Sequence, residues 1–480
     1  MYTAEDISVL KEEFELEYCR NSSKTHRERL YENYQDKLEI NKSLNRSLIS
    51  FQANKIEPLY RWFKYKEGFS SAFVLHMLKL FGQPDQGQVV LDPFAGIGTT
   101  ITTSIQNGFN ALGIELLSPG ILATEARIAS SIINSKLLNE TINELKNLNF
   151  KNSKVPQKYF FQHLTITKGA FSDETEVAIA NVSQYITERC ANSKMNSLLK
   201  FAISSILEDV SFTRKDGQYL RWDSRSSRKL KSKFNKGKIH EFKSRFLEKL
   251  QMIQEDIKSV NTLKTLNDFN LMHGSCLNIL HDINDESVDL IITSPPYCNR
   301  YDYTRTYALE LAFDGVDHQK IKELRQTLLS ATVENKSKYT QLNKLYQNLG
   351  KQDVFEKVVD SFRNQLALKE ALASLHIHKD ELNNKNIPDM VSNYFFEMNF
   401  VIRELARTLR PNGKIVMVND NVRYNGDEIP VDLILSEFAR EAGLQTDVIW
   451  VLERGKGNSS QQMGTHGRKE MRKCVYVWSK

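Results

Sequence analysis

The sequence predicts an α/β protein built on a seven-stranded, mostly parallel β-sheet. Short runs of β-branched and aromatic residues recur along the chain, and predicted helices separate the early ones. That alternation is typical of parallel strands covered by helices on both faces. The last two runs have a long Gly-, Ser-, Lys- and Arg-rich segment between them instead of a helix. We therefore expect the C-terminal strand to pair antiparallel. Two long polar segments interrupt the pattern and predict helical insertions.

The predicted strands are short apolar runs bounded by polar or glycine-containing residues. In chain order they are the run that ends at Asp92 and the segments 111–116, 269–274, 288–293, 414–419, 447–452 and 474–479. Residues 1 to about 50 are polar with little Gly or Pro, which predicts helix. A further helix is expected over 397–410, because a Pro-Asn-Gly sequence follows this amphipathic segment and stops it.

The composition favours a globular protein of the cytoplasm. The chain has 480 residues, of which 40% are hydrophobic and 26% charged. Its five cysteines lack paired spacing, which favours reduced thiols over a disulfide framework or a zinc site, and we expect no metal. The first residues are acidic, unlike a signal peptide, and no stretch reaches transmembrane length. A net charge of +6 matters only where it clusters.

Two strand ends predict a nucleoside site, because ligands of open α/β sheets bind at the carboxyl ends of the strands. Asp92 ends one strand, and Gly96 and Gly98 allow a backbone turn too tight for a Cβ atom. The next strand ends at Glu115, where an acidic residue accepts hydrogen bonds from ribose hydroxyls. No third glycine follows, so a mononucleoside such as S-adenosylmethionine fits better than a dinucleotide. A structural turn and a solvated glutamate are the alternative.

The sequence Ser-Pro-Pro-Tyr follows the fourth predicted strand. Pro295 fixes its own φ angle, ends the strand and holds Ser294 extended. The Ser294 hydroxyl and the Pro-Pro carbonyls then become fixed acceptors, and Tyr297 offers a flat face. Such a site suits a planar ring with an exocyclic amine, whose nitrogen could attack a methyl group directly. A Pro-Pro turn with a packing tyrosine is the alternative. Cys298 is interpreted as a bystander, because that chemistry needs no thiol.

These motifs resemble those of the DNA amino-methyltransferases. "DPFAGIGTT" is similar to their cofactor loop, and "SPPY" to their catalytic tetrapeptide in the variant typical of N4-methylcytosine enzymes. Adenine enzymes more often have Asp or Asn at the position of Ser294. The family commonly has an aspartate where Ser275 stands. Residues 61–74 resemble a segment that helps cover the methionine end of the cofactor.

The resemblance implies a Rossmann-like class I methyltransferase fold with an interrupted core. The expected segments are an N-terminal helical segment 1–54, core parts 55–125, 266–315 and 390–480, a basic helical insertion 126–265 and a second helical insertion 316–389. The implied catalytic residues are Ser294, Pro295, Pro296 and Tyr297. The implied cofactor-binding residues are Asp92, Phe94, Ala95, Gly96, Gly98, Thr99, Glu115, Ser275 and Tyr65.

The implied activity is site-specific transfer of a methyl group from S-adenosylmethionine to the N4 amine of a cytosine flipped out of duplex DNA. Restriction–modification is the implied setting, with a cognate restriction endonuclease acting on the same site as a candidate partner. Three alternatives remain: an adenine-N6 DNA methyltransferase, an RNA amino-methyltransferase and a non-catalytic DNA-recognition subunit.

Residues 212–246 are the best candidate for DNA recognition, because they combine many Lys and Arg residues with interleaved aromatic residues. The candidate DNA contacts are Arg214, Lys215, Arg221, Trp222, Arg225, Arg228, Lys229 and Lys231. A solvated helix face is the alternative interpretation of this charge run. Residues 454–473 form a second basic candidate loop near the catalytic edge.

Overall fold

The computed structural model describes residues 24–65, 67–216, 219–229, 233–259, 268–453, 467 and 469–480. Its centre is one large sheet with the strand order β1-β11-β12-β8-β7-β2-β3-β6. Every neighbouring pair is parallel except the two pairs that β12 makes with β11 and β8. The predicted α/β fold and its antiparallel C-terminal strand are therefore confirmed.

The predicted count of seven strands is wrong, because the sheet has eight. The strands are β1 (Leu38–Ile40), β2 (Val89–Asp92), β3 (Asn110–Glu115), β6 (Phe269–His273), β7 (Val288–Thr293), β8 (Leu409–Asp420), β11 (Gln445–Val451) and β12 (Lys473–Ser479). The extra strand, β1, is a three-residue edge strand paired with β11, within a segment expected to be helical. It is too short to show a period of two.

The central strands are buried on both faces, which explains their unbroken apolar sequences. In β2, Val90 belongs to the hydrophobic cluster that contains helix α3 (Ser71–Phe81), whereas Leu91 belongs to a different cluster, which contains the helices α18 and α19. These helices are α18 (Ile387–Thr408) and α19 (Val431–Glu441). The predicted helix 397–410 is thus the second half of α18. Helices α4 (Thr99–Gln106), α5 (Ser118–Ser130) and α11 (Cys276–Ile279) begin just beyond the carboxyl ends of β2, β3 and β6.

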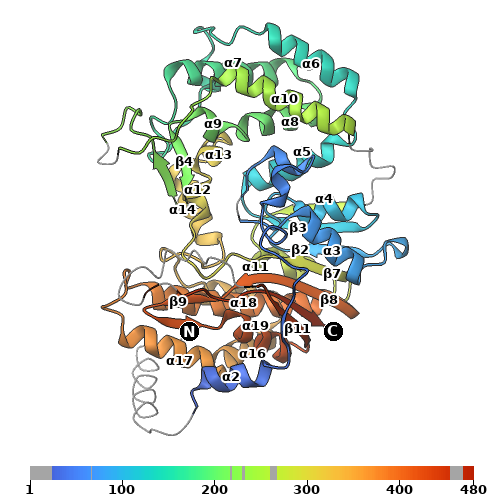
Figure 1. The fold of residues 1–480 in the computed structure, drawn as a ribbon, viewed down its shortest axis with the longest axis vertical. Helices are drawn as coiled ribbons and strands as arrows, with labels where there is room; N and C mark the ends of the chain where they lie inside the picture. Colours follow the sequence, from blue (N-terminus) through green and yellow to red (C-terminus); the bar gives the residue numbers. More distant parts are fainter. Residues whose placement is uncertain are drawn as a thin grey trace.

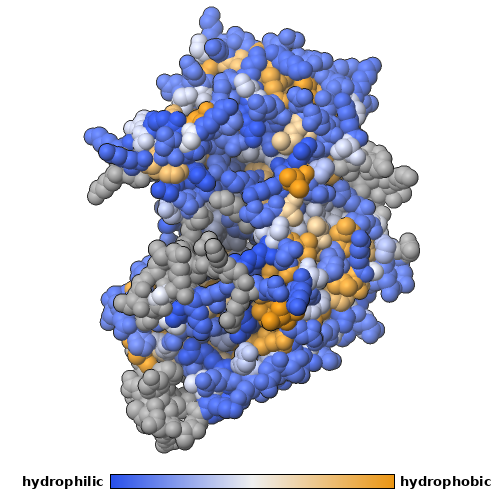
Figure 2. Space-filling view, in the orientation of Figure 1, coloured by the Kyte–Doolittle hydropathy of each residue, from blue (hydrophilic) through white to orange (hydrophobic). Residues whose placement is uncertain are grey.

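The first insertion forms a helical lobe above the sheet (Figure 1). Its helices are α6 (Ser135–Asn147), α7 (Asp173–Arg189), α8 (Ser193–Ser204), α9 (Leu207–Val210) and α10 (Phe242–Ser259). They surround a hydrophobic core of their own, which also includes Trp62 and Phe63 from the N-terminal part. The described residues of the basic run before residue 242 are not helical, contrary to expectation, because β4 (Thr213–Asp216) and β5 (Tyr219–Trp222) pair as a hairpin. The outer surface of this lobe is largely hydrophilic (Figure 2).

The second predicted insertion is helical but is not set apart from the core. It contains α14 (His318–Thr327), α15 (Tyr339–Asn348), α16 (Gln352–Asn364) and α17 (Leu366–Ile377). Residues of α15, α16 and α17 belong to the same hydrophobic cluster as α18 and the sheet.

The remaining elements are short. They are α2 (His26–Tyr34), α12 (Tyr303–Thr306), α13 (Ala308–Phe313), the hairpin β9 (Val422–Tyr424) and β10 (Asp427–Ile429), and the 3-10 helices η1 (Ala53–Lys55), η2 (Tyr60–Trp62), η3 (Pro84–Gln86), η4 (Gln157–Tyr159) and η5 (Leu280–Asp282). Within the described ranges, none of the helices combines the length and apolar character that a bilayer-crossing segment needs.

Candidate active site

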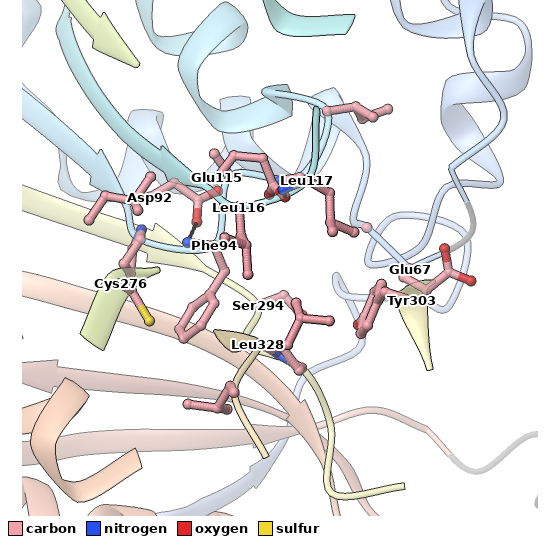
Figure 3. Close-up of a pocket in the computed structure, with 18 of the residues that line it drawn as sticks. Glu67, Asp92, Phe94, Glu115, Leu116, Leu117, Cys276, Ser294, Tyr303 and Leu328 are labelled. Atoms are coloured by element: carbon pink, nitrogen blue, oxygen red, sulfur yellow. Dashed lines mark hydrogen bonds between the residues drawn. The ribbon is translucent and has the colours of Figure 1, made fainter. Parts of the chain in front are cut away.

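A cavity lies at the carboxyl ends of β2, β3 and β7 (Figure 3). Eight of the nine predicted cofactor residues line it: Tyr65, Asp92, Phe94, Ala95, Gly96, Thr99, Glu115 and Ser275. Ser294 and Pro296 of the tetrapeptide also line it, whereas Gly98, Pro295 and Tyr297 do not. Motifs about 200 residues apart in sequence therefore meet at one cavity.

The glycine turn after β2 requires left-handed backbone at both glycines, with φ of 54° at Gly96 and 70° at Gly98. A Cβ atom at Gly98 would lie 2.3 Å from the Thr124 hydroxyl oxygen. The bare backbone of Gly98 thus makes room for helix α5, not for a ligand. A Cβ atom at Gly96 would lie 3.2 Å from the Tyr65 ring, at the wall of the cavity. Gly96 is the glycine that keeps the cavity open.

Glu115 accepts hydrogen bonds from the backbone N–H groups of Gly96 and Leu117, each over 2.7 Å. These bonds tie the end of β3 to the glycine turn. Burial raises the pKa of Glu115 to about 7, although the two backbone donors pull it down. The carboxyl group therefore titrates near neutral pH and keeps further lone pairs available towards the cavity.

Asp92 joins the two halves of the site. Its carboxylate accepts hydrogen bonds from the hydroxyls of Thr100 and Thr293, each over 2.7 Å, and from the Phe94 N–H group over 3.1 Å. Thr293 directly precedes the tetrapeptide, and Thr100 follows the glycine turn. Burial raises the pKa of Asp92 to about 6, against the opposing effect of these donors. The side chain has its bonds within the protein, so its direct role is to hold the two loops together.

The Ser294 hydroxyl donates a hydrogen bond to the Val418 carbonyl over 3.1 Å. When its proton is directed to this carbonyl, the oxygen keeps lone pairs for an incoming donor. The Tyr297 hydroxyl is a second, more distant acceptor for the same proton, 3.4 Å from the Ser294 Oγ atom. The Lys473 ammonium lies 5.5 Å from the centre of the Tyr297 ring, and pairs with Asp420 over 3.5 Å.

Cys298 is fully buried, and burial raises the pKa of its thiol. A buried thiol held in its neutral form is a poor nucleophile. This environment supports the interpretation of Cys298 as a bystander.

Glu67, Tyr303, Leu328 and Leu329 also line the cavity but were not singled out from the sequence, although Glu67 lies in the segment 61–74 that was expected to cover the methionine end of the cofactor. Glu67 accepts hydrogen bonds from the hydroxyls of Tyr301 and Tyr307. The available signal was the cluster of tyrosines in "RYDYTRTY" (300–307), directly after the tetrapeptide. The two leucines come from the second insertion, and nothing in their sequence marks them as part of a site.

The structure corrects the prediction for Lys215, which was expected to contact DNA phosphates. Its ammonium is buried and donates a hydrogen bond to Glu310 Oε1 over 2.5 Å. Lys215 lies on the inner face of the hairpin, because alternate residues of a strand point to opposite faces.

Other cations of the basic run also contact the protein itself. Arg225 pairs with Asp223 over 2.7 Å, and the Arg228 guanidinium lies 4.1 Å from the centre of the Trp222 ring. Arg221 lies 4.0 Å from the Phe234 ring centre and contacts Asp216 over 3.1 Å.

Arg214 and Lys229 are the clearest solvent-facing candidates of the basic run. Both are exposed, and neither makes a hydrogen bond or ion pair with another residue that the structure describes. Lys231 and most of the second basic loop, 454–466 and 468, lie outside the described residues.

A family model described as DNA methylase, for N6 and N4 methyltransferases, matches residues 8–119. The type II methyltransferase M.BsoBI of Geobacillus stearothermophilus is 41% identical over 461 residues, which cover 92% of this chain and 90% of that protein. The type II methyltransferase M.AvaI of a Nostoc strain is 44% identical over 466 residues, covering 94% and 92% of the two chains. No solved structure matches the chain.

Proposed function

The chain belongs to the N6/N4 family of DNA methylases, and we propose that it is a site-specific DNA methyltransferase that modifies the N4 amine of cytosine with S-adenosylmethionine as methyl donor. The family follows from relatives more than 40% identical over nine-tenths of both chains. The donor and the exocyclic amine as target are inferred from the geometry of the cavity, and the choice of cytosine over adenine is inferred from the family resemblance.

The residues at the carboxyl ends of β2 and β3 suit S-adenosylmethionine. Glu115 would accept hydrogen bonds from the ribose hydroxyls, and the bare Gly96 turn leaves room for the methionine part. Glu67 places a second carboxylate at the cavity wall, complementary to a cationic ligand. When bound, S-adenosylmethionine supplies an electrophilic methyl group on a positively charged sulfur.

The orientation of Ser294 is the observation that carries the proposal for an exocyclic amine. Its proton is engaged by Val418, so its oxygen faces a ligand as an acceptor. An acceptor there, together with the Pro295 carbonyl, would take the amine hydrogens and direct the nitrogen lone pair at the methyl group. It would also stabilise the positive charge that develops on the nitrogen. A serine at this position favours cytosine N4 over adenine N6, by the family resemblance described above.

The target amine of duplex DNA is inside the base stack, so the base must be flipped out before reaction, which costs a few kcal/mol. Tyr297 would offset part of this cost by stacking on the flipped base. Outside the cavity, the exposed cations Arg214 and Lys229 would contact phosphates.

The relatives are named type II methyltransferases, which supports a restriction–modification setting in the cytoplasm. A restriction endonuclease of the same specificity would then be the cognate partner.

The proposal is tested by sequencing DNA from bacteria that express the protein and by nucleoside mass analysis, with DNA from cells without it as control. N4-methylcytosine at one recurring sequence is the expected result. Detection of N6-methyladenine instead would show that adenine is the target base, and the proposed acceptor mechanism would still hold. If purified protein with S-adenosylmethionine leaves the control DNA from cells without the protein unmodified, the proposed activity is wrong.

A further inference from the structure

The two faces of the β4–β5 hairpin differ in chemistry. On the outer face Arg214 lies opposite Arg221, and the hairpin register places both side chains in solvent. On the inner face Lys215 lies opposite Leu220, and both side chains are buried. Arg221 is paired with Asp216 over 3.1 Å, so Arg214 is the exposed cation that the outer face offers to a phosphate. The hairpin therefore presents an exposed arginine backed by a buried lysine.

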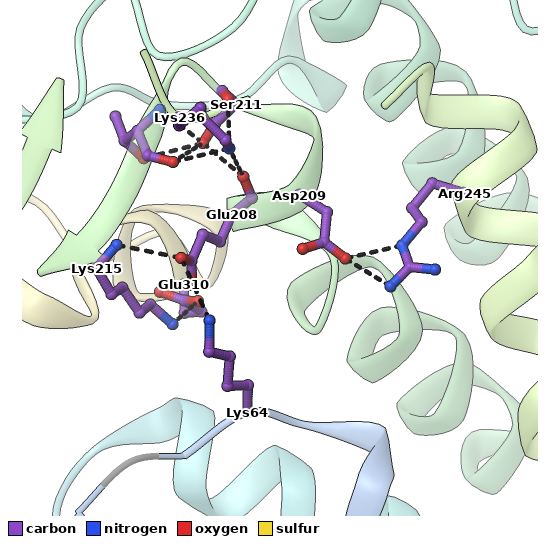
Figure 4. A network of polar contacts seen from close by, with 9 residues as sticks. Lys64, Glu208, Asp209, Ser211, Lys215, Lys236, Arg245 and Glu310 are labelled. Carbon is purple, nitrogen blue, oxygen red and sulfur yellow. Dashed lines mark hydrogen bonds and ion pairs between the residues drawn. The ribbon is translucent and has the colours of Figure 1, made fainter. Parts of the chain in front are cut away.

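Lys215 attaches the hairpin to helix α13, which follows the tetrapeptide in sequence (Figure 4). Its ammonium donates to Glu310 over 2.5 Å, with only 4% and 1% of the two side chains exposed. The same ammonium lies 4.4 Å from the centre of the Tyr307 ring, close enough for a cation–π interaction. Its backbone N–H group donates to Glu208 over 3.2 Å. An isolated two-stranded hairpin is marginally stable, so these contacts fix its position.

Tyr307 continues the contacts to the wall of the cavity. Its hydroxyl donates to Glu67 over 2.5 Å, and its ring stacks on Tyr65 at 5.0 Å between centres and 18° between planes. Tyr65 in turn packs beside Gly96, and both Tyr65 and Glu67 line the cavity. One continuous series of contacts thus runs from Lys215, the neighbour of Arg214, through the buried Tyr307 and the half-buried Tyr65 and Glu67 to the glycine turn.

We propose that Lys215 is a positioning residue that couples DNA binding at the hairpin to cofactor binding in the cavity, an inference that rests on the proposed function. DNA on the outer face restrains the hairpin, and Lys215 transmits that restraint through Tyr307 to Glu67 and Tyr65. Bound cofactor restrains the same residues from the other side. Because binding free energies are reciprocal, each ligand raises the affinity for the other by the same factor.

The ion pair has the features expected of such a link. Replacing a buried ion pair by apolar residues is often neutral or stabilising, so stability alone does not explain its presence. An ion pair depends on direction, however, and a cation–π contact holds the lysine at a defined place over the ring. Together these contacts fix the position of Lys215 more narrowly than an apolar contact would.

The test is a calorimetric titration with S-adenosylhomocysteine, which binds without turnover, in the absence and presence of a duplex carrying the site mapped by sequencing. For the wild-type protein we expect DNA to raise the affinity by about 5- to 150-fold, the usual range of allosteric coupling. In the double variant Lys215→Met, Glu310→Leu, each ligand should still bind alone, but the affinity should become the same with and without DNA. Tyr307→Phe, which keeps the ring and removes the bond to Glu67, should also lower the coupling.

Lys249→Met is the matched control. Lys249 is equally buried in the same lobe and donates to the Trp62 carbonyl over 2.7 Å, away from Tyr307. This variant should keep the coupling even if it loses stability. Wild-type protein that binds both ligands independently would overturn the inference and leave the proposed function intact. Wild-type protein that fails to bind one of the ligands would instead contradict the proposed function. Full coupling in a folded Tyr307→Phe variant would exclude the route through Glu67.

Discussion

The cavity at the sheet edge and the basic hairpin were both conspicuous in the sequence, but they are built differently. Nearly all of the residues predicted for the cofactor line one cavity. In the basic run, by contrast, Lys215 and Arg225 are bound to acidic residues of the protein itself. The cavity residues sit in loops whose path is set by glycine, proline and strand ends. The cations of the basic run had no such constraint in sequence.

This difference shows which sequence motifs predict the direction of a side chain and which do not. A tight turn or a Pro-Pro step fixes the backbone locally, so the direction of the next side chain follows from sequence. A run of charges fixes nothing locally, and tertiary contacts decide which charges face water. Single substitutions in the cavity should therefore have large effects, and single substitutions on the hairpin small ones.

The largest effect is expected for Tyr297→Ala. It removes a stacking face worth about 1–3 kcal/mol for an extruded base, by analogy with single-strand binding proteins. Single-turnover methyl transfer to a duplex carrying the site should fall accordingly, while cofactor affinity stays unchanged. Tyr297→Phe is the control and should keep much of the activity, because the ring matters more than the hydroxyl. Equal losses in both variants would show that the hydroxyl is the functional group.

A smaller but selective loss is expected for Ser294→Ala. One hydrogen-bond acceptor for the amine is removed, worth about 0.5–1.5 kcal/mol. The rate of methyl transfer should fall by this amount while DNA and cofactor affinities hardly change. Ser294→Thr, which retains a hydroxyl, is the comparison variant. A loss of affinity equal to the loss of rate would assign Ser294 to binding.

Cofactor affinity should depend on pH through Glu115, whose pKa is raised to about 7 by burial. If the ionised carboxylate accepts the ribose hydroxyls, the dissociation constant of S-adenosylhomocysteine should rise about tenfold per pH unit below 7 and level off above it. Stability follows the opposite sign: the raised pKa favours the folded state at low pH, and that contribution is lost as pH rises through 7. Glu115→Gln should bind more weakly, with no such pH dependence between pH 6 and 8.

In the basic run, Arg214→Glu on the hairpin and Lys229→Glu beyond it should each have a small effect on DNA affinity. Removing one phosphate-binding cation should lower the slope of log affinity against log salt by about 0.9, with cofactor affinity unchanged. Arg225→Glu is the contrasting variant, because Arg225 is paired with Asp223 and its reversal should destabilise the loop instead. Unchanged slopes for both exposed cations would place DNA binding elsewhere on the molecule.

The smallest effect is expected for Cys298→Ala. The thiol is buried and held neutral, and the proposed reaction needs no enzyme nucleophile. Methyl transfer by the folded variant should stay close to wild type, in a single-turnover assay, and 5-methylcytosine should not appear. An inactive, folded Cys298→Ala protein would overturn direct transfer.

The fold could be predicted from sequence wherever strands are buried on both faces. VDLIIT is an unbroken apolar run, and β7 spans Val288–Thr293 as predicted. β1 could not be predicted, since three residues at a sheet edge depend on pairing with β11 rather than on their own pattern. The sequence of the hairpin was interpreted as helical because charged residues occur on both of its faces. Lys215 lies on the buried face, so buried and exposed positions do not alternate between apolar and polar residues.

The residues of the site also divide into those predictable from local sequence and those placed by long-range contacts. Glu115 and Ser294 follow strand ends, so their place at the edge of the sheet is implied by sequence. Glu67 reaches the cavity only through its bonds to Tyr301 and Tyr307, which are more than 230 positions away. Contacts over such separations depend on how the helices pack and leave no local signal.

The carboxylate of Asp92 has a practical consequence for protein engineering. It binds Thr100 and Thr293, so the cofactor loop and the catalytic tetrapeptide share one connector despite lying 201 positions apart. Asp92 and Thr100 belong to the cofactor loop itself, whereas Thr293 directly precedes the tetrapeptide. A chimera that exchanges the tetrapeptide to change base preference should therefore keep Thr293, and designs that replace Thr293 along with the tetrapeptide should assemble poorly.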